Sequence, residues 1–216
     1  ALDDFIADGN GIAAAALGCE ADDLAYVDGA FSAPNGQNMT WADIARHSNK
    51  AGGHSVLGEF TPPDVTYPNG CHVCEVEIDP KTGKVAFCDY TVVEDVGTVL
   101  SPDLVDGQMH GGVAQGIGQA LGENLLFDLH GQLLTGSFLD YQMPVASDFP
   151  PFRIMTIAVP TAINPLGAKG VGEAGTVGAL AATMNAVADA LASAGVYDFE
   201  MPATPYRVWH ALQFST

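Results

Sequence analysis

The spacing of hydrophobic and polar residues in the first fifty positions predicts a helix, a hairpin and a second helix. Residues 1–18 carry a run of small apolar residues that a glycine closes, as glycine does at helix ends. Residues 24–31 alternate as two short strands around an Asp-Gly turn. Residues 40–50 predict a short helix that begins at Thr40, with Asp43 three residues on in a variant of the capping box.

The rest of the chain alternates more strongly and predicts strands paired with longer helices. The clearest pattern is a hairpin with long arms at 71–79 and 85–95. The further elements that we expect are a helix at 102–127, strands at 131–144 and 152–160, a long helix that ends near 191 and a short helix at 201–212. Strand pairs mixed with separate helices indicate the α+β class.

A proline-rich stretch divides the chain into two predicted lobes. Residues 54–68 hold three prolines and lack a periodic pattern, which is typical of an extended linker. We therefore expect a small helix-hairpin-helix lobe at 1–55 and a larger lobe at 56–216.

The predicted helix at 102–127 is unusually rich in glycine. Each glycine inside a helix costs up to about 1 kcal/mol relative to alanine. Tolerance of so many indicates that something packs very close to this backbone. The glycines are Gly107, Gly111, Gly112, Gly116 and Gly118.

Composition narrows the classes of function. The chain has 216 residues and a formal net charge of −19, so it repels phosphate backbones and nucleic acid is an unsuitable partner. The acidity itself is most simply a matter of solubility. No apolar run is long enough to predict a membrane span, and no signal peptide is visible.

Four cysteines leave two interpretations open. Cys71 and Cys74 form a C-x2-C pair that could be half of a zinc site, but no second close pair of Cys or His follows. The strand pattern of 71–79 would also turn these two side chains to opposite faces. Reduced thiols, which this favours, suit a cytoplasmic location.

The bend at 167–176 places one carboxylate, Glu173, among glycines at the start of a helix. Glu173 could be a helix N-terminal carboxylate, or a base aimed at a ligand that the glycines allow to approach the backbone. Gln115, in the other glycine-rich element, could be a surface residue or could bind a polar heterocycle through its amide. The bend lacks the strand-GxGxxG-helix pattern of dinucleotide-binding proteins.

Five stretches, in this order along residues 20–212, resemble the C-terminal part of one family of large subunits. The family is the molybdopterin-binding large subunit of the molybdenum hydroxylases, which include xanthine dehydrogenase, aldehyde oxidase and carbon monoxide dehydrogenase. The stretches are YPNGCHVCEVEIDPKTGKV, GQMHGGVAQGIGQAL, GQLLTGSFLDYQMP, NPLGAKGVGEAGTVGA and MPATPYRVW.

The resemblance implies a fold, a reaction and roles for individual residues. It implies a molybdopterin-binding domain with mixed sheets and packed helices. The reaction is the oxidative hydroxylation, with water, of an aldehyde, an N-heterocycle or a CO-like substrate. Glu173 corresponds to the family's general base, and burial among glycines and apolar residues would desolvate it. The cofactor-binding positions that the resemblance implies are Gln115, Gly112, Lys169, Gly170, Val171 and Gly172; no protein ligand to the metal is implied.

The resemblance also implies partners. The cofactor would be molybdopterin with molybdenum, in its cytosine dinucleotide form, shared with the N-terminal half of the large subunit. FAD and [2Fe-2S] clusters would sit on partner subunits of a larger oligomer. The cofactor-contacting loops of that N-terminal half are absent from this sequence, so this chain alone should supply half a pocket and little catalysis. A non-catalytic assembly or binding module with the same fold is the alternative.

Three further residues receive structural roles from the sequence. Asp95 matches a family loop and is expected to make an Asx turn. His110, before two glycines, is expected at a structural or interface position. Asp140 and the residues around it are expected to pack in a core strand.

Overall fold

The computed structural model describes residues 1–48 and 55–214, which form two compact units. The units are residues 1–61 and 62–216, whereas the sequence placed the division after residue 55. The last two residues of the predicted helix at 40–50 lie outside the described residues. Each unit is described by itself.

The first unit packs two helices on a small antiparallel sheet. Helix α1 (Leu2–Leu17) ends at Gly18, which takes the left-handed conformation at φ 70°. A 3₁₀ turn (Ala21–Asp23) leads to strands β1 (Ala25–Val27), β2 (Ala30–Ser32) and β3 (Asn38–Thr40), in that order in the sheet, and then to helix α2 (Trp41–His47). The buried core of this unit consists of Ala13, Phe31, Met39 and Ile44.

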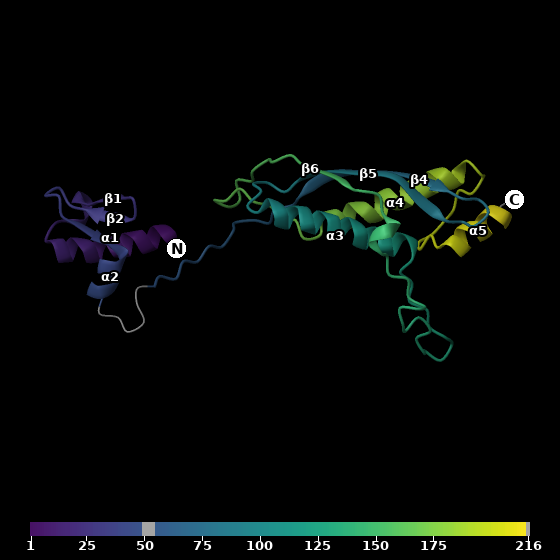
Figure 1. Ribbon diagram of the computed structural model, residues 1–216, viewed down its shortest axis with the longest axis horizontal. Helices are drawn as coiled ribbons and strands as arrows, with labels where there is room; N and C mark the ends of the chain where they lie inside the picture. Colours follow the sequence, from purple (N-terminus) through teal and green to yellow (C-terminus); the bar gives the residue numbers. More distant parts are fainter. Residues whose placement is uncertain (49–54, 215–216) are drawn as a thin grey trace. The chain divides into compact units, whose positions relative to one another are not determined.

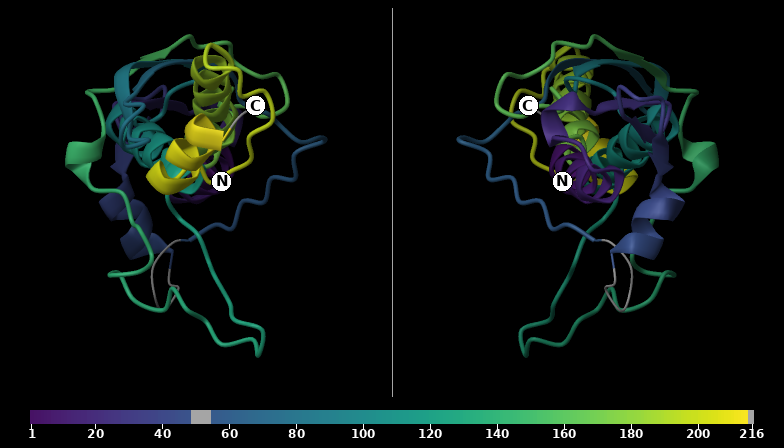
Figure 2. Two further views of the ribbon diagram at one scale, coloured as in Figure 1. Left: turned by 90° about the vertical axis from the view of Figure 1, so that its right-hand side faces the viewer. Right: turned by 90° about the vertical axis from the view of Figure 1, so that its left-hand side faces the viewer.

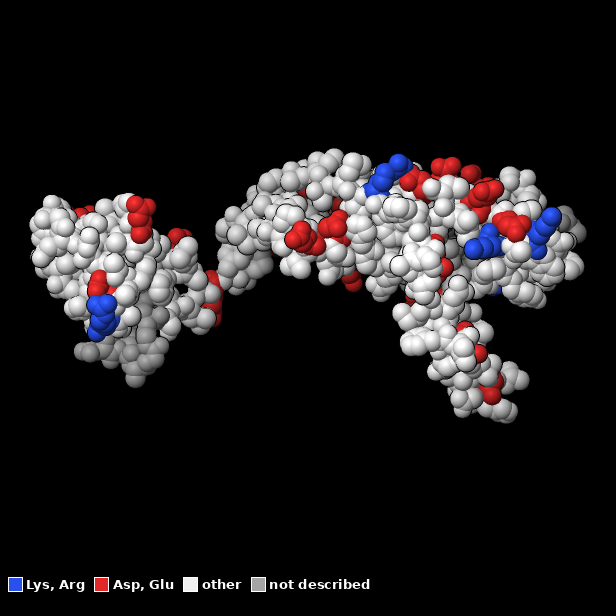
Figure 3. Space-filling model, in the orientation of Figure 1, with Lys and Arg blue, Asp and Glu red and all other residues white. Residues whose placement is uncertain are grey.

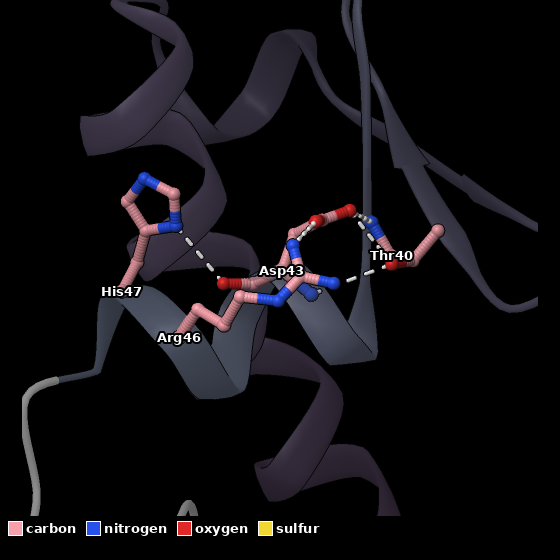
Figure 4. Close-up of polar contacts among 4 residues, drawn as sticks. All are labelled: Thr40, Asp43, Arg46 and His47. Carbon is pink, nitrogen blue, oxygen red and sulfur yellow. Dashed lines mark hydrogen bonds and ion pairs between the residues drawn. The ribbon is translucent and has the colours of Figure 1, made fainter.

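The start of α2 confirms the predicted capping box (Figure 4). The Thr40 backbone N–H donates to Asp43 Oδ2 at 3.0 Å, and the Asp43 backbone N–H donates to Thr40 Oγ1 at 3.4 Å. Arg46 adds a hydrogen bond to the other Asp43 oxygen at 2.7 Å. The hydrogen bonds from the Thr40 hydroxyl and backbone N–H hold the pKa of Asp43 below its ordinary value.

The second unit is built on a three-stranded mixed sheet. Strands β4 (Asn69–Ile78) and β5 (Val85–Asp95) form the predicted hairpin, and β6 (Arg153–Thr156) pairs in parallel with β5. The strict alternation along β4 turns one set of side chains inward and leaves the other exposed. The register shifts between Glu75 and Val76, opposite Cys88, so that the hairpin carries a β-bulge.

Two long helices pack side by side against the inner face of this sheet (Figures 1 and 2). They are α3 (Pro102–Leu121) and α4 (Ala174–Ala192), and a shorter helix α5 (Pro205–Phe214) packs near the C-terminal part of α4. The main core lies between the sheet and the helices and contains Tyr90, Val92, Met109, Val113, Ile117, Ala174 and Ala179. The observed fold confirms the predicted α+β class.

The glycines of α3 are explained by the closeness of α4. A Cβ atom on Gly112 would lie 3.0 Å from Gly175 Cα, and one on Gly116 would lie 2.7 Å from Ala179 Cβ. A Cβ on Gly175 would lie 2.7 Å from the backbone oxygen of Met109. The glycines of α3 predicted that another element packs very close to this helix. That element is the start of α4, which belongs to the second glycine-rich stretch. By contrast, Gly107 and Gly111 face open space.

The segment 122–145, here called the arm, is not the core strand that the sequence predicted. Helix α3 ends at Leu121 instead of continuing to 127, and the arm extends away from the helices as turns and one isolated bridge (Figures 1 and 2). Phe138 is 80% exposed and Leu139 98% exposed, so they are not core residues. Asp140 is also exposed and accepts a hydrogen bond from the Ser137 hydroxyl at 2.8 Å. Of the strand predicted at 152–160, only the four residues of β6 pair with β5.

Replacing Gly175 by alanine is expected to lower the melting temperature by several degrees. The new Cβ would meet backbone atoms of α3, and overpacking of this kind costs about 1–3 kcal/mol. The matched control is Gly107→Ala, where nothing lies near the new methyl group and alanine should stabilise the helix by about 0.5–1 kcal/mol. Thermal unfolding followed by circular dichroism distinguishes the two; equal shifts in both variants would contradict the close crossing.

Candidate functional site

Glu173 lies at the N-terminal end of α4. It is the N-cap residue of the helix, and its side chain makes no capping hydrogen bond, whereas its carbonyl oxygen accepts from the Val177 N–H at 3.0 Å. The side chain is exposed, which corrects the expectation of a carboxylate buried in a dry niche.

A cavity of about 760 Å³ lies beside Glu173. Its walls come from the bend before α4, from α4 as far as Asn185, from the residues just before β4 and the start of β4, and from the end of β5. The lining residues are Thr66, Tyr67, Pro68, Gly70, His72, Glu94, Gly170, Val171, Gly172, Glu173, Ala174, Val177, Gly178, Ala181, Ala182 and Asn185. Four of the sequence-predicted site residues, 170 to 173, therefore meet at one cavity.

The two glycines of the bend leave the backbone accessible. A Cβ atom on Gly170 or Gly172 would meet nothing within 4 Å, so no packing inside the chain requires a glycine at either position. Both residues line the cavity. A ligand could thus reach the backbone at these two residues. Glycine-rich bends before helices commonly bind ligands in this way.

A buried hydrogen-bond network forms the floor of the cavity. His72 Nε2 lies 3.2 Å from Glu94 Oε1, and His72 Nδ1 lies 2.9 Å from the Tyr90 hydroxyl. The side chains of His72 and Glu94 are only 4% and 5% exposed. Burial raises the pKa of Tyr90, so this hydroxyl keeps its proton.

Two glycines make room for this network. A Cβ on Gly70 would lie 2.1 Å from the Glu94 carboxyl carbon, and one on Gly178 would lie 2.4 Å from His72 Nε2. From the sequence, His72 was recognised only as part of the C-x2-C stretch, and Glu94 was not identified as a site residue. The available signal was the alternation itself, since position 72 of β4 and positions 90, 92 and 94 of β5 all face the core.

Gln115 and Gly112 lie in α3, beside the cavity-lining helix and outside the cavity. Gln115 is exposed, and its Oε1 accepts a hydrogen bond from Thr176 Oγ1 at 3.3 Å. Gly112 is buried against Gly175. Gln115 contacts the start of α4 through its hydrogen bond, and Gly112 does so through its packing. Neither residue lines the cavity beside Glu173.

Lys169 is held by Asp95 and faces a separate, smaller pocket. Its Nζ lies 2.5 Å from Asp95 Oδ2, and both side chains are largely buried. Asp95 also accepts from the Gly97 N–H at 2.9 Å, the Asx turn that the sequence predicted, and from the Val159 N–H at 3.0 Å. The ammonium group of Lys169 and these backbone donors hold the pKa of Asp95 below its ordinary value.

His110 takes a structural place on α3. Its Nδ1 lies 2.9 Å from the Asp106 carbonyl oxygen one turn earlier, and its ring lies 5.9 Å from that of Phe152.

The Asp95 cluster is expected to make stability depend on acid pH. A carboxyl group whose pKa is lower in the folded than in the unfolded state stabilises the fold above the unfolded pKa, and that contribution is lost as pH falls through the folded value. Asp95→Asn should therefore melt below the unaltered chain at pH 7, and the difference should shrink as pH falls below about 4. Melting curves from pH 7 to pH 3 test this; a difference that stays constant would show that the charge is unimportant.

The cysteines occupy the positions that strand alternation predicts. Cys71 is exposed, whereas Cys74 points inward and is partly buried. Burial raises the pKa of the Cys74 thiol to about 11. The two sulfurs therefore do not face one another, and no group of three or more His, Cys, Asp or Glu side chains suited to a metal occurs among residues 1–48 and 55–214.

Thiol labelling should follow this exposure. With a thiolate-selective reagent at pH 8, Cys71 and Cys88 are expected to react rapidly and Cys74 at least about tenfold more slowly, because only the thiolate is nucleophilic. Mass spectrometry of digested samples measures the order. Fast labelling of Cys74 would contradict its inward position.

Comparison with known proteins identifies the family. The model of the molybdopterin cofactor-binding domain matches residues 1–150 of this chain. The chain belongs to this family. It is part of the large-subunit family of molybdenum hydroxylases, in agreement with the resemblance found in the sequence.

Individual relatives give the same assignment. The carbon monoxide dehydrogenase large chain of Hydrogenophaga pseudoflava is 38% identical over 180 residues, which is 81% of this chain and 22% of that protein. The nicotine 6-hydroxylase large subunit of Paenarthrobacter nicotinovorans is 47% identical over 145 residues, 67% of this chain and 18% of that protein. The chain thus spans about a fifth of the length of these relatives.

Solved structures share the fold over almost the whole chain. A Cu,Mo-CO dehydrogenase in its carbon monoxide reduced state matches 99% of this chain and 28% of its own, with a TM-score of 0.83 and 30% identity. Quinoline 2-oxidoreductase from Pseudomonas putida 86 matches 99% of this chain and 29% of its own, with a TM-score of 0.81 and 33% identity. Within the described residues, no helix is long and apolar enough to span a membrane.

Proposed function

We propose that this chain forms one wall of the active site of a molybdenum hydroxylase and that Glu173 is its general base. The enzyme would oxidatively hydroxylate an aldehyde, an N-heterocycle or a CO-like substrate with water. The observation that carries the proposal is a carboxylate with no capping role, at the end of Gly170-Val171-Gly172, beside a cavity of about 760 Å³.

The residues around the cavity fit a molybdopterin cofactor. Gly170 and Gly172 leave open space above an accessible backbone, as a flat, polar heterocycle requires. In the proposal Gly170, Val171 and Gly172 would hold the pterin. When bound, the cofactor supplies the two-electron oxidation. Gln115 would contact the dinucleotide end of the cofactor, and Lys169 would lie near its phosphate. Gly112 would allow α3 and α4 to approach closely enough for both contacts.

The role of Glu173 follows from its position. A general base must lie within hydrogen-bond reach of the proton that it removes, and its pKa must suit the working pH. The carboxylate is exposed in this chain, so in the assembled enzyme the groups that fill the cavity would have to exclude water from it. Val171 and Ala174 already give it apolar neighbours on one side.

The finer assignments are part of the same proposal. The remainder of the large subunit would complete the pocket, the cofactor would be the cytosine dinucleotide form, and FAD and [2Fe-2S] clusters would lie on partner subunits of an oligomer. The relatives' printed names support carbon monoxide, nicotine-type and purine substrates as candidates. All four cysteines are free thiols, which supports a cytoplasmic location.

Glu173→Gln should lower kcat about a hundredfold or more in the assembled enzyme, because the amide cannot accept the proton. The matched control is Asp140→Asn, which removes the same charge on the arm, outside the cavity. Steady-state turnover is measured with molybdenum content checked by mass spectrometry. Near-normal turnover in the Glu173 variant, at full molybdenum content, would refute the assignment.

A non-catalytic assembly module is the second candidate, and one observation favours it. The Glu173 carboxylate, which a general base would need to have sheltered from water, is exposed. Molybdenum bound to the isolated chain, together with dehydrogenase activity, would exclude this candidate. Neither property would be expected of a docking module.

A further inference from the structure

Strand β4 (Asn69–Ile78) has a strand beside it on one side only. The order of the sheet is β4-β5-β6, so the edge of β4 away from β5, here called the free edge, pairs with no strand. Successive residues of a strand direct their backbone N–H and C=O groups to opposite edges in turn, so about half of these groups on β4 face away from β5. Among residues 1–48 and 55–214, none of them makes a backbone hydrogen bond outside the pairing with β5.

The free edge lacks most of the features that protect edge strands from pairing. Natural edge strands are commonly very short, or carry lysine, proline or a bulge. β4 has ten residues, and none of them is Lys, Arg or Pro. The extra residue of the bulge, Cys88, lies on β5. The strand is therefore an uninterrupted template for one more strand.

The inner side chains of β4 are incompletely covered. Tyr90 and Val92 on the central strand β5 are fully buried. Val76 and Ile78 on β4 are only partly buried, although both pack against the apolar core that involves α4 and α5. A further strand beside β4, with apolar side chains on its inner face, would complete their burial.

The outer face of β4 carries two carboxylates, Glu75 and Glu77, that are exposed. Asp89 lies across from Glu75 on β5 and is already paired with Arg153. Neither glutamate has an ion-pair partner among the residues that the structure describes. Acidic side chains gather over this part of the second unit (Figure 3). Lys or Arg at the facing positions of an added strand would stabilise the pairing.

Two observations favour a strand from the rest of a large subunit over a second copy of this chain. Two solved relatives match 99% of this chain, and the matched part is only 28% and 29% of their own chains. Most of such a subunit therefore lies outside the matched part. Two copies joined through β4 would instead bring the Glu75 and Glu77 side chains of both onto one face, and each copy has a net charge of −19. Facing like charges destabilise a strand pair.

We propose that the free edge of β4 is a docking site for one extended strand from the remainder of the large subunit. This strand carries Lys or Arg on its outer face, beside Glu75 and Glu77, and apolar residues on its inner face, beside Val76 and Ile78. Backbone hydrogen bonds provide the affinity, and the alternation of side chains provides the specificity. The inference rests on the proposed assembly with the rest of the large subunit, but it requires neither Glu173 nor turnover.

A synthetic peptide tests the site on the 216-residue chain. The probe is the acetylated and amidated peptide KVKVTVKVK, and its control is the block peptide KKKKTVVVV, which has the same composition. The alternating peptide should bind at least about tenfold more tightly in isothermal calorimetry, because only its strand has a basic face and an apolar face. Equal affinities would indicate simple attraction to an acidic chain and would overturn the proposal. Absence of binding by the alternating peptide would also overturn it.

Backbone methylation of the alternating peptide separates strand pairing from charge attraction. N-methylation of its four valines removes the N–H donors on one edge, and N-methylation of the residues between them removes those on the other edge, with the charge unchanged. One methylated peptide should bind at least about tenfold more weakly than the parent, because its blocked edge faces β4, and the other should bind within about threefold. Loss of binding in both, or in neither, would refute strand addition.

Hydrogen exchange locates the bound strand. The amides of β4 should exchange at least about tenfold more slowly when the alternating peptide binds, because N–H groups on the free edge gain acceptors. The matched control is β6 (Arg153–Thr156), the other edge strand of the sheet, whose exchange should not change. In the assembled large subunit β4 should be protected without the peptide. Protection of β6 in place of β4, or an unprotected β4 in the assembled subunit, would contradict the docking site.

A double variant tests the two glutamates. Glu75→Gln combined with Glu77→Gln should weaken binding of the alternating peptide about three- to tenfold, because two cross-strand charge pairs are lost. The control, Glu20→Gln combined with Asp22→Asn, removes the same charge from the first unit and should change the affinity less than about twofold. Equal losses would refute the role of the glutamates.

Light scattering distinguishes the two occupants. The unaltered chain should be a monomer, because the occupant that we propose is a different segment of polypeptide. A dimer that the alternating peptide dissociates would show that a second copy occupies the free edge, and it would overturn the assignment.

The two proposals fail in different ways. Turnover that does not depend on Glu173, combined with a protected β4 in the assembled subunit, counts against the proposed function alone. Glu173-dependent turnover combined with an unprotected β4 counts against the docking site alone.

Discussion

The close crossing of α3 and α4 is the contact on which the rest of the second unit depends. Gly112 and Gly116 on one helix and Gly175 on the other remove the side chains that would hold the two backbones apart. Gly175 is the second residue of α4, so this contact also fixes the helix end that carries Glu173. A helix that is weakened by its own glycines is stabilised here by tertiary packing, which commonly outweighs intrinsic propensity.

A second contact places the same helix on the sheet. His72 on β4 occupies the space that Gly178 leaves on α4, and Glu94 on β5 occupies the space beside Gly70. Each glycine therefore admits one member of a buried polar pair. Because a buried carboxylate is tolerated only when it is hydrogen-bonded, His72 and the Tyr90 hydroxyl are as much a part of the fold as the apolar core around them.

The sequence predicted the elements whose signals are local. The hairpin at 71–95, the capping box at Thr40 and the Asx turn at Asp95 were all recognisable because alternation and short-range hydrogen bonds act within a few residues. The arm was mispredicted because Phe138 and Leu139 have the composition of a core strand, and only tertiary structure shows that nothing in this unit covers them. The Glu94 network was missed for the same reason, since its two hydrogen bonds join residues 18 and 22 positions apart along the chain.

The exposure of Glu173 bears on what this unit can do by itself. A carboxylate in water is a poor base at neutral pH, and desolvation is the change that strengthens it. This chain supplies the position of the carboxylate, through the α3–α4 crossing, but only one of the walls that would keep water away. Glu94 differs in this respect, because the chain alone already buries it. The proton transfer that we propose at Glu173 therefore needs the cavity to be filled.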